Sequence, residues 1–502
     1  MNNSTTVLEQ RQREVDVRLD RRWQPESKRP ILGSGNLVYE ISSRVKAMSA
    51  GGIGLIEQLV ESVGLRRSLD ERVHVFKRHL PYHESDHVLT MVYNLLAGGQ
   101  SIEDIGQLRR NVSFLDAVGA HRLPGPSTSG DFLRRLKLSD IEDLMEAQND
   151  ARLRVWRAQN SSFRERALID VDGTIVETTG EKKEGADFSY NGKYGYGPLL
   201  VTMANTGEVL YVANRPANRP SHEGSVKWLD RAVDLALAGR FKKVRLRGDT
   251  DFALTRNFDR WTANDVEFVF GMDANPSFVS RADALSESEW TVLERPTKKQ
   301  PKTASRSKRP AAKDVVVKAR GMKNFRLAAE SWAEMEYQPS KADGTYRLIA
   351  LRKNITVDDG NTMFDQIRYF FLVTNLPASM LSATEVIFQS NARCNQENII
   401  GQLKHGVPAM RMPAGDLVAN WAYMVIAIMA WNIKQWLALM LPRRAGAAKL
   451  AKMEFRTFLN NVMLVPAQIK KGARKLTIRL LAYNSWIPLI LRGSVRLRQL
   501  TT

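Results

Sequence analysis

Two aspartates and one glutamate in this 502-residue sequence are placed where they could act together. Asp172 and Asp249 each come at the end of an apolar run of β type, and Glu397 lies in a stretch of helical pattern. Three carboxylates delivered by two strands and a helix form an oxygen-rich site of the kind that Mg²⁺ prefers. The sequence therefore predicts that Asp172, Asp249 and Glu397 are catalytic residues and metal ligands.

Two basic side chains accompany the glutamate in the stretch Asn391–Lys404. Arg393 precedes Glu397 by four residues and Lys404 follows it by seven, spacings that place all three side chains on one face of an expected helix. Arg393 could pair with Glu397 or orient it, and Lys404 could neutralise a phosphate near a reacting bond. We expect the neighbouring acids, Asp251 and Glu177, to lie outside the ligand set.

These elements, in this order, resemble the DDE transposases of bacterial insertion sequences. The resemblance covers roughly residues 75–440. It rests on Asp-Gly-Thr at Asp172, on Gly-Asp-Thr-Asp-Phe-Ala around Asp249, and on Arg-x3-Glu-x6-Lys ending at Lys404. The family pattern has a tyrosine three residues before the arginine, and this chain has Ser390 there.

The resemblance implies an α/β fold with an RNase H-like catalytic core of mixed sheet, interrupted by a β-rich insertion and flanked by mostly α-helical regions. It implies a DNA transposase of an insertion sequence that binds terminal inverted repeats and catalyses metal-dependent strand cleavage and strand transfer. Asp172, Asp249 and Glu397 would hold two Mg²⁺ or Mn²⁺ ions, while Arg393 and Lys404 would support DNA binding. The implied partners are double-stranded DNA, as repeat ends and target, and a second copy of the chain in a synaptic complex.

Composition points to a polyanionic partner. The sequence has 74 Lys and Arg against 54 Asp and Glu, a formal net charge of +20, and a pI near 9.9. Its one cysteine, Cys394, excludes a disulfide framework or a cysteine-based zinc site. No N-terminal secretory signal is visible, and the apolar run Trp421–Trp431 is shorter than the ~20 residues of a membrane span. We therefore expect a protein of the bacterial cytoplasm, associated with the nucleoid, without a membrane partner.

The elements that must position the carboxylates change character near residue 160. Up to Arg157 the apolar residues recur at helical spacing. Beyond it, three strands, a helix and a fourth strand are expected, which is the order of an RNase H-like core with its first strand central and its fourth beside it. Asp172 and Asp249 would then be adjacent. The expected elements are strands at 167–176, 199–204, 209–214 and 244–246, a helix at 225–238, and a fifth strand at 266–270.

Asp249 and Glu397 are far more widely separated in sequence than a compact α/β core requires, so an inserted subdomain is implied. Two segments rich in Lys and Arg, 298–313 and the chain after Pro442, are predicted to contact DNA phosphates. The expected regions are a flexible N-terminal arm (1–50), a helical DNA-binding domain (51–160), a first part of the core (161–272), a β-rich insertion with a basic linker (273–366), a second part of the core (367–440) and a basic helical C-terminal region (441–502).

Other functions compete for some of the same residues. Asp-Val-Asp-Gly-Thr from Asp170 matches the nucleophile motif of haloacid dehalogenase-type phosphatases, in which Asp170 would attack phosphorus and Asp172 would act as the acid. Ala253 and Leu254 stand where that family's later motif needs an aspartate. A catalytically inactive DNA-binding protein would share the same charge and fold, so only activity separates it from a transposase.

A zinc-protease signature, HExxH, occurs at His83–His87. A catalytic zinc site needs a third ligand within reach, and the following residues up to Gly99 supply no His or Glu. Ser85 and Asp86 fit instead as capping residues for the apolar helix that follows. We therefore expect this motif to be structural.

Overall fold

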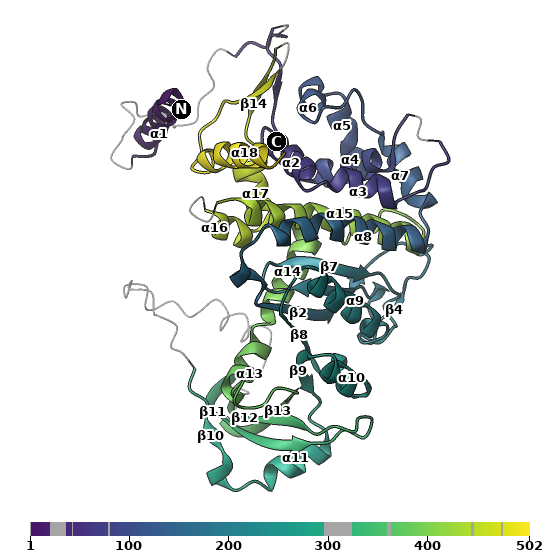
Figure 1. Ribbon diagram of the computed structural model, residues 1–502, viewed down its shortest axis with the longest axis vertical. Coiled ribbons are helices and arrows are strands. Elements are labelled where there is room, and N and C mark those ends of the chain that lie inside the picture. Colours follow the sequence, from purple (N-terminus) through teal and green to yellow (C-terminus); the bar gives the residue numbers. More distant parts are fainter. Residues whose placement is uncertain are drawn as a thin grey trace.

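The computed structural model describes residues 2–20, 37–42, 44–78, 81–295, 324–358, 363–442, 446–472 and 475–501. A mixed sheet of nine strands runs through the molecule in the order β10-β11-β12-β13-β9-β8-β2-β6-β7 (Figure 1). A layer of helices covers the β7 end of this sheet, and the β10–β13 end lies at the opposite pole of the molecule (Figure 1). The segment 298–313, predicted to contact DNA, lies outside the described residues.

Five strands form the half of the sheet that carries the two aspartates. They are β2 (Arg166–Gly173), β6 (Leu199–Met203), β7 (Glu208–Ala213), β8 (Lys243–Gly248) and β9 (Val266–Met272). β2 lies between β6, which is antiparallel to it, and β8, which is parallel to it, and β9 continues the parallel pairing. The first strand is thus central with the fourth beside it, as expected. Strands β6, β7, β8 and β9 are almost wholly buried, which explains their apolar runs.

Local chemistry sets the connections of this half. Gly207, in the turn between β6 and β7, has φ +73°, a conformation that favours glycine and closes the hairpin. Helix α9 (Ser225–Ala238) has the bounds expected from the sequence and packs on β2, β6, β7 and β8. It does so because Trp228, Leu229 and Ala232 fall on one buried stripe at helical spacing. Short helix α10 (Phe258–Ala263) leads into β9.

The segment predicted to be an insertion contains four strands, and they are continuous with the rest of the sheet. Its strands are β10 (Thr291–Val292), β11 (Asn324–Tyr337), β12 (Tyr346–Asp358) and β13 (Met363–Thr374), preceded by α11 (Pro276–Asp283). β11, β12 and β13 form an antiparallel meander, and β13 then pairs with β9. The predicted boundary at 366/367 falls inside β13, because one long strand serves both the meander and the shared sheet.

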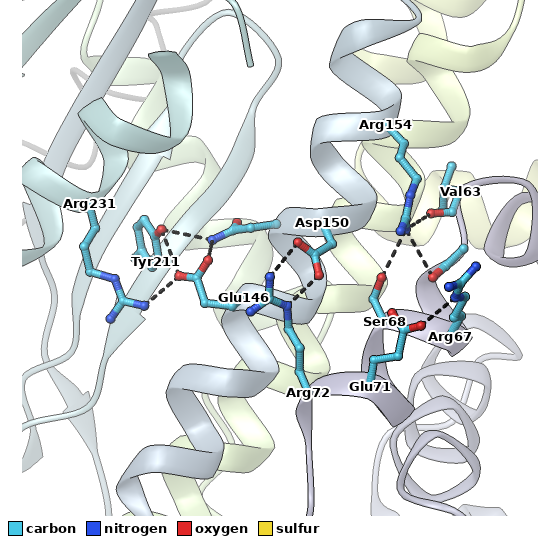
Figure 2. A network of polar contacts seen from close by, with 12 residues as sticks. Val63, Arg67, Ser68, Glu71, Arg72, Glu146, Asp150, Arg154, Tyr211 and Arg231 are labelled. Carbon is cyan, nitrogen blue, oxygen red and sulfur yellow. Dashed lines mark hydrogen bonds and ion pairs between the residues drawn. The ribbon is translucent and has the colours of Figure 1, made fainter. Parts of the chain in front are cut away.

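The segment expected to be a helical domain is helical. Its helices are α2 (Ile53–Ser62), α3 (Leu65–Arg72), α4 (Glu84–Leu96), α5 (Ile105–Arg109), α6 (Val112–Ala117), α7 (Pro126–Arg135) and α8 (Leu138–Arg157). Helix α8 joins this domain to the sheet (Figure 2). On one side Arg72 of α3 pairs with Asp150 through two hydrogen bonds of 2.5 and 2.9 Å, and on the other Arg231 of α9 pairs with Glu146 at 2.6 Å.

Helix α15 (Leu417–Met440) is the centre of the helical layer and contains the apolar run 421–431. By length and composition it is the one helix of the described chain that could cross a membrane, but 83% of its apolar window is buried inside the protein. It packs against α4, α7, α8 and β7. The run is therefore part of a buried core helix.

Lys434 is a fully buried cation on α15. Its Nζ donates to Ala451 O at 3.1 Å and lies 4.4 Å from the centre of the Trp431 ring. Burial lowers the pKa of Lys434 to about 7. The folded chain therefore binds this proton less readily than an unfolded one.

Replacing Lys434 by Met should raise the melting temperature near neutral pH, because an apolar side chain of similar length removes the cost of the buried charge. A lysine whose folded pKa is lowered contributes stability that grows as pH rises from about 7 towards 10.5. Thermal unfolding measured across that pH range should show stability rising with pH in the wild type and not in Lys434→Met. Parallel profiles for the two proteins would contradict this expectation.

The C-terminal end of the chain lies beside α2 of the helical domain, and the N-terminal helix lies further out (Figure 1). The N-terminal segment, expected to be a flexible arm, forms α1 (Asn2–Leu19), and Arg11 Nη1 donates to Leu480 O at 3.2 Å. We expected a helical C-terminal region, but the structure also has strands there. Besides α16 (Ala447–Lys452), α17 (Phe455–Phe458) and α18 (Ile487–Thr501), it has β14 (Ala467–Lys471) and β15 (Leu476–Leu480), and β14 pairs with β1 (Ala47–Met48). A partner strand from the other end of the chain completes this small sheet.

Candidate active site

The register of two parallel strands places the two predicted aspartates side by side. Asp170 of β2 is opposite Arg247 of β8. Two residues further along each strand lie Asp172, at the end of β2, and Asp249, directly after β8. Because the carboxyl ends of parallel strands meet at one edge of a sheet, both carboxylates lie at that edge. Asp249 also accepts a hydrogen bond from Asp251 N at 3.1 Å, which fixes the turn after β8.

The predicted glutamate lies on a helix that approaches this edge. We expected one uninterrupted helix over the stretch 391–404, but the structure has a break in it. Helix α13 (Ala383–Asn391) ends first, and α14 (Cys394–His405) begins after Arg393, which is its N-cap residue. Glu397 and Lys404 therefore share α14, with Glu397 exposed to solvent in its first turn.

Arg393 points into the site from the junction of α13 and α14. Its Nη2 lies 3.9 Å from Asp249 Oδ2 and donates to Val171 O at 3.4 Å. The side chain is only 14% exposed, and its Nε is buried without a hydrogen-bond partner. The carboxylate that Arg393 pairs with is thus Asp249 and not Glu397, the partner suggested by helical spacing.

The carboxylates share one electrostatic environment. The pKa of Asp172 is raised to about 6, mainly by burial and next by the charge of Asp249, while Arg393 opposes the rise and Glu397 adds to it. Burial likewise raises the pKa of Asp249, again opposed by Arg393. A cation bound among these groups would relieve both the burial cost and the mutual repulsion.

A donor set made only of carboxylate oxygens fits a hard cation such as Mg²⁺ or Mn²⁺. Among the residues that the structure describes, no three acidic, histidine or cysteine side chains are close enough to hold one ion as they stand. The three carboxylates would therefore have to approach one another before they could share a cation. The residues fit such an ion in their chemistry.

The raised pKa of Asp172 predicts how the stability of the metal-free protein depends on pH. An acid whose folded pKa is raised from 3.8 to about 6 contributes stability that is fully present below about pH 4 and is lost as pH rises through about 6. Asp172→Asn should lack this loss, so it should be more stable than the wild type near pH 7 when a chelator is present. Urea unfolding of the two proteins over this pH range measures the difference, and equal stability near pH 7 would contradict it.

Lys404 is tied to the segment that follows β2. Its Nζ donates to Ile175 O at 2.8 Å, and burial together with the nearby Lys193 lowers its pKa. Lys193 in turn pairs with Glu177, so this exposed acid is not oriented to the aspartates. Glu177 lies on β3 (Val176–Glu177), and Lys193 directly precedes β5 (Tyr194–Tyr196); these two strands form a small sheet with β4 (Asp187–Phe188). Contact between Lys404 and a phosphate stays a prediction.

The two rival motifs have structural roles. Asp170 is 1% exposed, and both of its carboxylate oxygens accept hydrogen bonds from Arg247, which does not fit a phosphatase nucleophile. In the zinc-protease signature, the Glu84 carboxylate accepts hydrogen bonds from the backbone N–H groups of residues 75 and 76 at 2.9 and 3.0 Å. His87 stacks on Phe132 with 4.7 Å between ring centres, and burial lowers its pKa to about 4.

Sequence reasoning missed two buried residues, Arg247 and Gln396, and the half-buried Gln389, which link the strands of the aspartates to α13 and α14. Arg247 donates hydrogen bonds to Asp170 and to the last turn of α13. Gln389 accepts hydrogen bonds from two arginines of β8, and Gln396 of α14 donates one to β2. A signal for Arg247 was present, because a charged residue interrupts an apolar strand two positions before Asp249. Nothing local marks the two glutamines.

Comparison with known proteins places this arrangement in a family. The family described as transposase DDE domain, group 1, matches residues 44–502, nearly the whole chain. No curated protein matches the sequence. Among solved structures, one similar chain is the piggyBac transposase in a synaptic complex with hairpin DNA, at 11% identity and a TM-score of 0.34, over 83% of this chain and 84% of that one. Since the family match spans far more than half of its length, the chain belongs to the DDE transposases of group 1.

Proposed function

We propose that this transposase serves an insertion sequence, binding its terminal inverted repeats and catalysing metal-dependent strand cleavage and strand transfer. The observation that carries the proposal is the register of β2 and β8, which brings Asp172 and Asp249 together at one sheet edge. Arg393 reaches the same edge from the helix junction that precedes Glu397. We assign Asp172, Asp249 and Glu397 as the catalytic carboxylates and Arg393 and Lys404 as supporting residues.

The core is proposed to be RNase H-like, interrupted by the β10–β13 insertion. Numbered along the chain, its five strands are arranged third, second, first, fourth and fifth, with the second antiparallel to its neighbours and the fourth and fifth parallel to the first. The insertion enters after β9 and leaves before α13. This order supports the proposal, because it delivers the first two carboxylates from adjacent strands and the third from a later helix.

The chain's own residues would bind and orient the reacting DNA. DDE transposases generally use divalent ions, and Asp172, Asp249 and Glu397 would hold two Mg²⁺ or Mn²⁺ ions here. The chemistry supplied by such ions is activation of a water or 3′-hydroxyl nucleophile and stabilisation of the leaving 3′-oxygen. Arg393, whose buried Nε has no partner, has donors available for a phosphate beside the scissile bond. No covalent link between enzyme and DNA is required.

Affinity for DNA is proposed to come from basic surfaces outside the carboxylate site. Helix α18 carries Arg492, Arg496 and Arg498, all exposed, and no acidic residue. An exposed row of cations without acids favours a polyanionic partner. The proposed partners are the repeat ends and the target DNA, held by two copies of the chain in a synaptic complex. The proposed location is the bacterial cytoplasm, at the nucleoid.

The direct test uses purified full-length protein and DNA fragments that end in the inverted repeats flanking its gene. With Mg²⁺ we expect strand breaks at the repeat ends and, with added target DNA, joined products, and neither product when a chelator replaces the metal. A fragment with scrambled repeats is the matched control. Binding to the repeats with no cleavage under any divalent ion would favour the inactive DNA-binding protein instead.

A further inference from the structure

A buried ion pair lies directly behind the two aspartates. Arg247 Nε donates to Asp170 Oδ1 at 2.6 Å, and Arg247 Nη2 donates to Asp170 Oδ2 at 2.8 Å. The two side chains are 2% and 1% exposed. Because side chains two apart on a strand share a face, this pair lies on the same face of the sheet as Asp172 and Asp249. It is a bidentate contact, the strongest arrangement available to an arginine and a carboxylate.

The same guanidinium also holds the end of α13. Arg247 Nη1 donates to Gln389 O at 3.0 Å, in the last turn of that helix. The last carbonyl groups of a helix have no partner within it, and a cation there is favourable. Arg245, two residues earlier on β8, donates from Nη1 to Gln389 Oε1 at 2.6 Å. Both oxygens of one glutamine are thus bound by β8.

A further contact fixes the residue next to the proposed catalytic glutamate. Gln396 is 1% exposed, and its Nε2 lies 3.3 Å from both Asp170 O and Leu200 O. It therefore links the first turn of α14 to β2 and β6. Together, Gln389 and Gln396 fasten the helical segment on either side of the α13–α14 junction to the strands that carry the aspartates.

We propose that Arg247 is a positioning residue for Glu397. Its planar guanidinium joins Asp170 on β2 to the end of α13. This contact sets the position of α14, and with it the position of Glu397 relative to Asp172 and Asp249. A lysine could pair with Asp170 but has no fork to hold the carboxylate and Gln389 O together. This inference rests on the proposed function, because it concerns how the third carboxylate reaches the other two.

The test compares Arg247→Met with Arg152→Met in the full-length protein. Arg152 is a matched control, because it is also a buried arginine, paired with Glu208 at 3.0 Å and bound to Val209 O at 2.7 Å, but it joins α8 to β7. Both substitutions leave a buried carboxylate without its arginine partner, so both should lower the melting temperature. Only Arg247→Met should also weaken Mn²⁺ binding by the folded protein, by about 10- to 100-fold in calorimetry with the metal alone.

Two further variants separate positioning from stability. Arg247→Lys keeps the charge beside Asp170, so it should fold well and still bind Mn²⁺ more weakly than the wild type. Asp170→Leu combined with Arg247→Met removes both buried charges and should regain thermal stability, but not Mn²⁺ affinity or the rate of cleavage at saturating DNA. If the double variant regained all three, or if Arg247→Met bound Mn²⁺ as well as Arg152→Met, the positioning role would be wrong. A wild type that neither binds Mn²⁺ nor cuts repeat ends would instead overturn the proposed function.

Discussion

Replacing Asp172, Asp249 or Glu397 by alanine is expected to abolish strand cleavage while leaving binding to repeat-end DNA nearly unchanged. Each carboxylate is proposed to serve the metal, whereas affinity comes from exposed cations such as those of α18. Losing roughly 4 kcal/mol or more of transition-state stabilisation lowers the rate by about three orders of magnitude. The measurements are cleavage of an end-labelled repeat fragment in Mg²⁺ and a gel-shift titration of the same fragment.

Asp251→Ala is the matched control for this set. Asp251 is an exposed acid two residues from Asp249, and its contact with the Asp249 carboxylate is made by its backbone N–H, which alanine keeps. Its cleavage rate should stay close to that of the wild type. A triad variant that cut DNA at a near wild-type rate would remove that residue from the catalytic set, and a variant that lost binding as well would show that its carboxylate supports the fold.

Arg393→Ala should slow cleavage by about 10²- to 10³-fold, the typical loss when one preorganised donor to a developing negative charge is removed. The guanidinium is held between Asp249 and the backbone of β2, so it needs little rearrangement to meet a phosphate at the same edge. It also lowers the pKa of both Asp172 and Asp249, so its loss should raise the pH at which cleavage reaches half of its maximum. A pH series of single-turnover rates measures both effects.

Lys404→Ala provides the comparison for Arg393. Lys404 already donates to Ile175 O and lies near Lys193 and Glu177. Its removal should slow cleavage less than Arg393→Ala and should leave the pH profile in place. If the two variants had the same pH profile and the same rate, the special position of Arg393 between the strands would not matter for the chemistry.

The sequence by itself determined the elements whose pattern is local. The buried strands were visible as apolar runs, and α9 has the predicted bounds of 225 and 238 because its apolar stripe is complete within the helix. Asp172 and Asp249 could be predicted at strand ends for the same reason. The expected order of strands and helix placed β8 beside β2, and the structure confirms this pairing, with Asp170 opposite Arg247.

Only the tertiary structure decided how distant segments meet. The pairing of β13 with β9 joins strands β10–β13 to the strands that carry the aspartates, and the pairing of β14 with β1 brings together segments from the two ends of the chain, because strand partners are chosen by contacts far apart in sequence. Helical spacing suggested Glu397 as one possible partner of Arg393, but the break between α13 and α14 places this arginine beside Asp249 instead. The contacts of Arg247 and Gln389 connect residues 142 positions apart, a separation at which no local periodicity carries information, so their role became visible only in the folded chain.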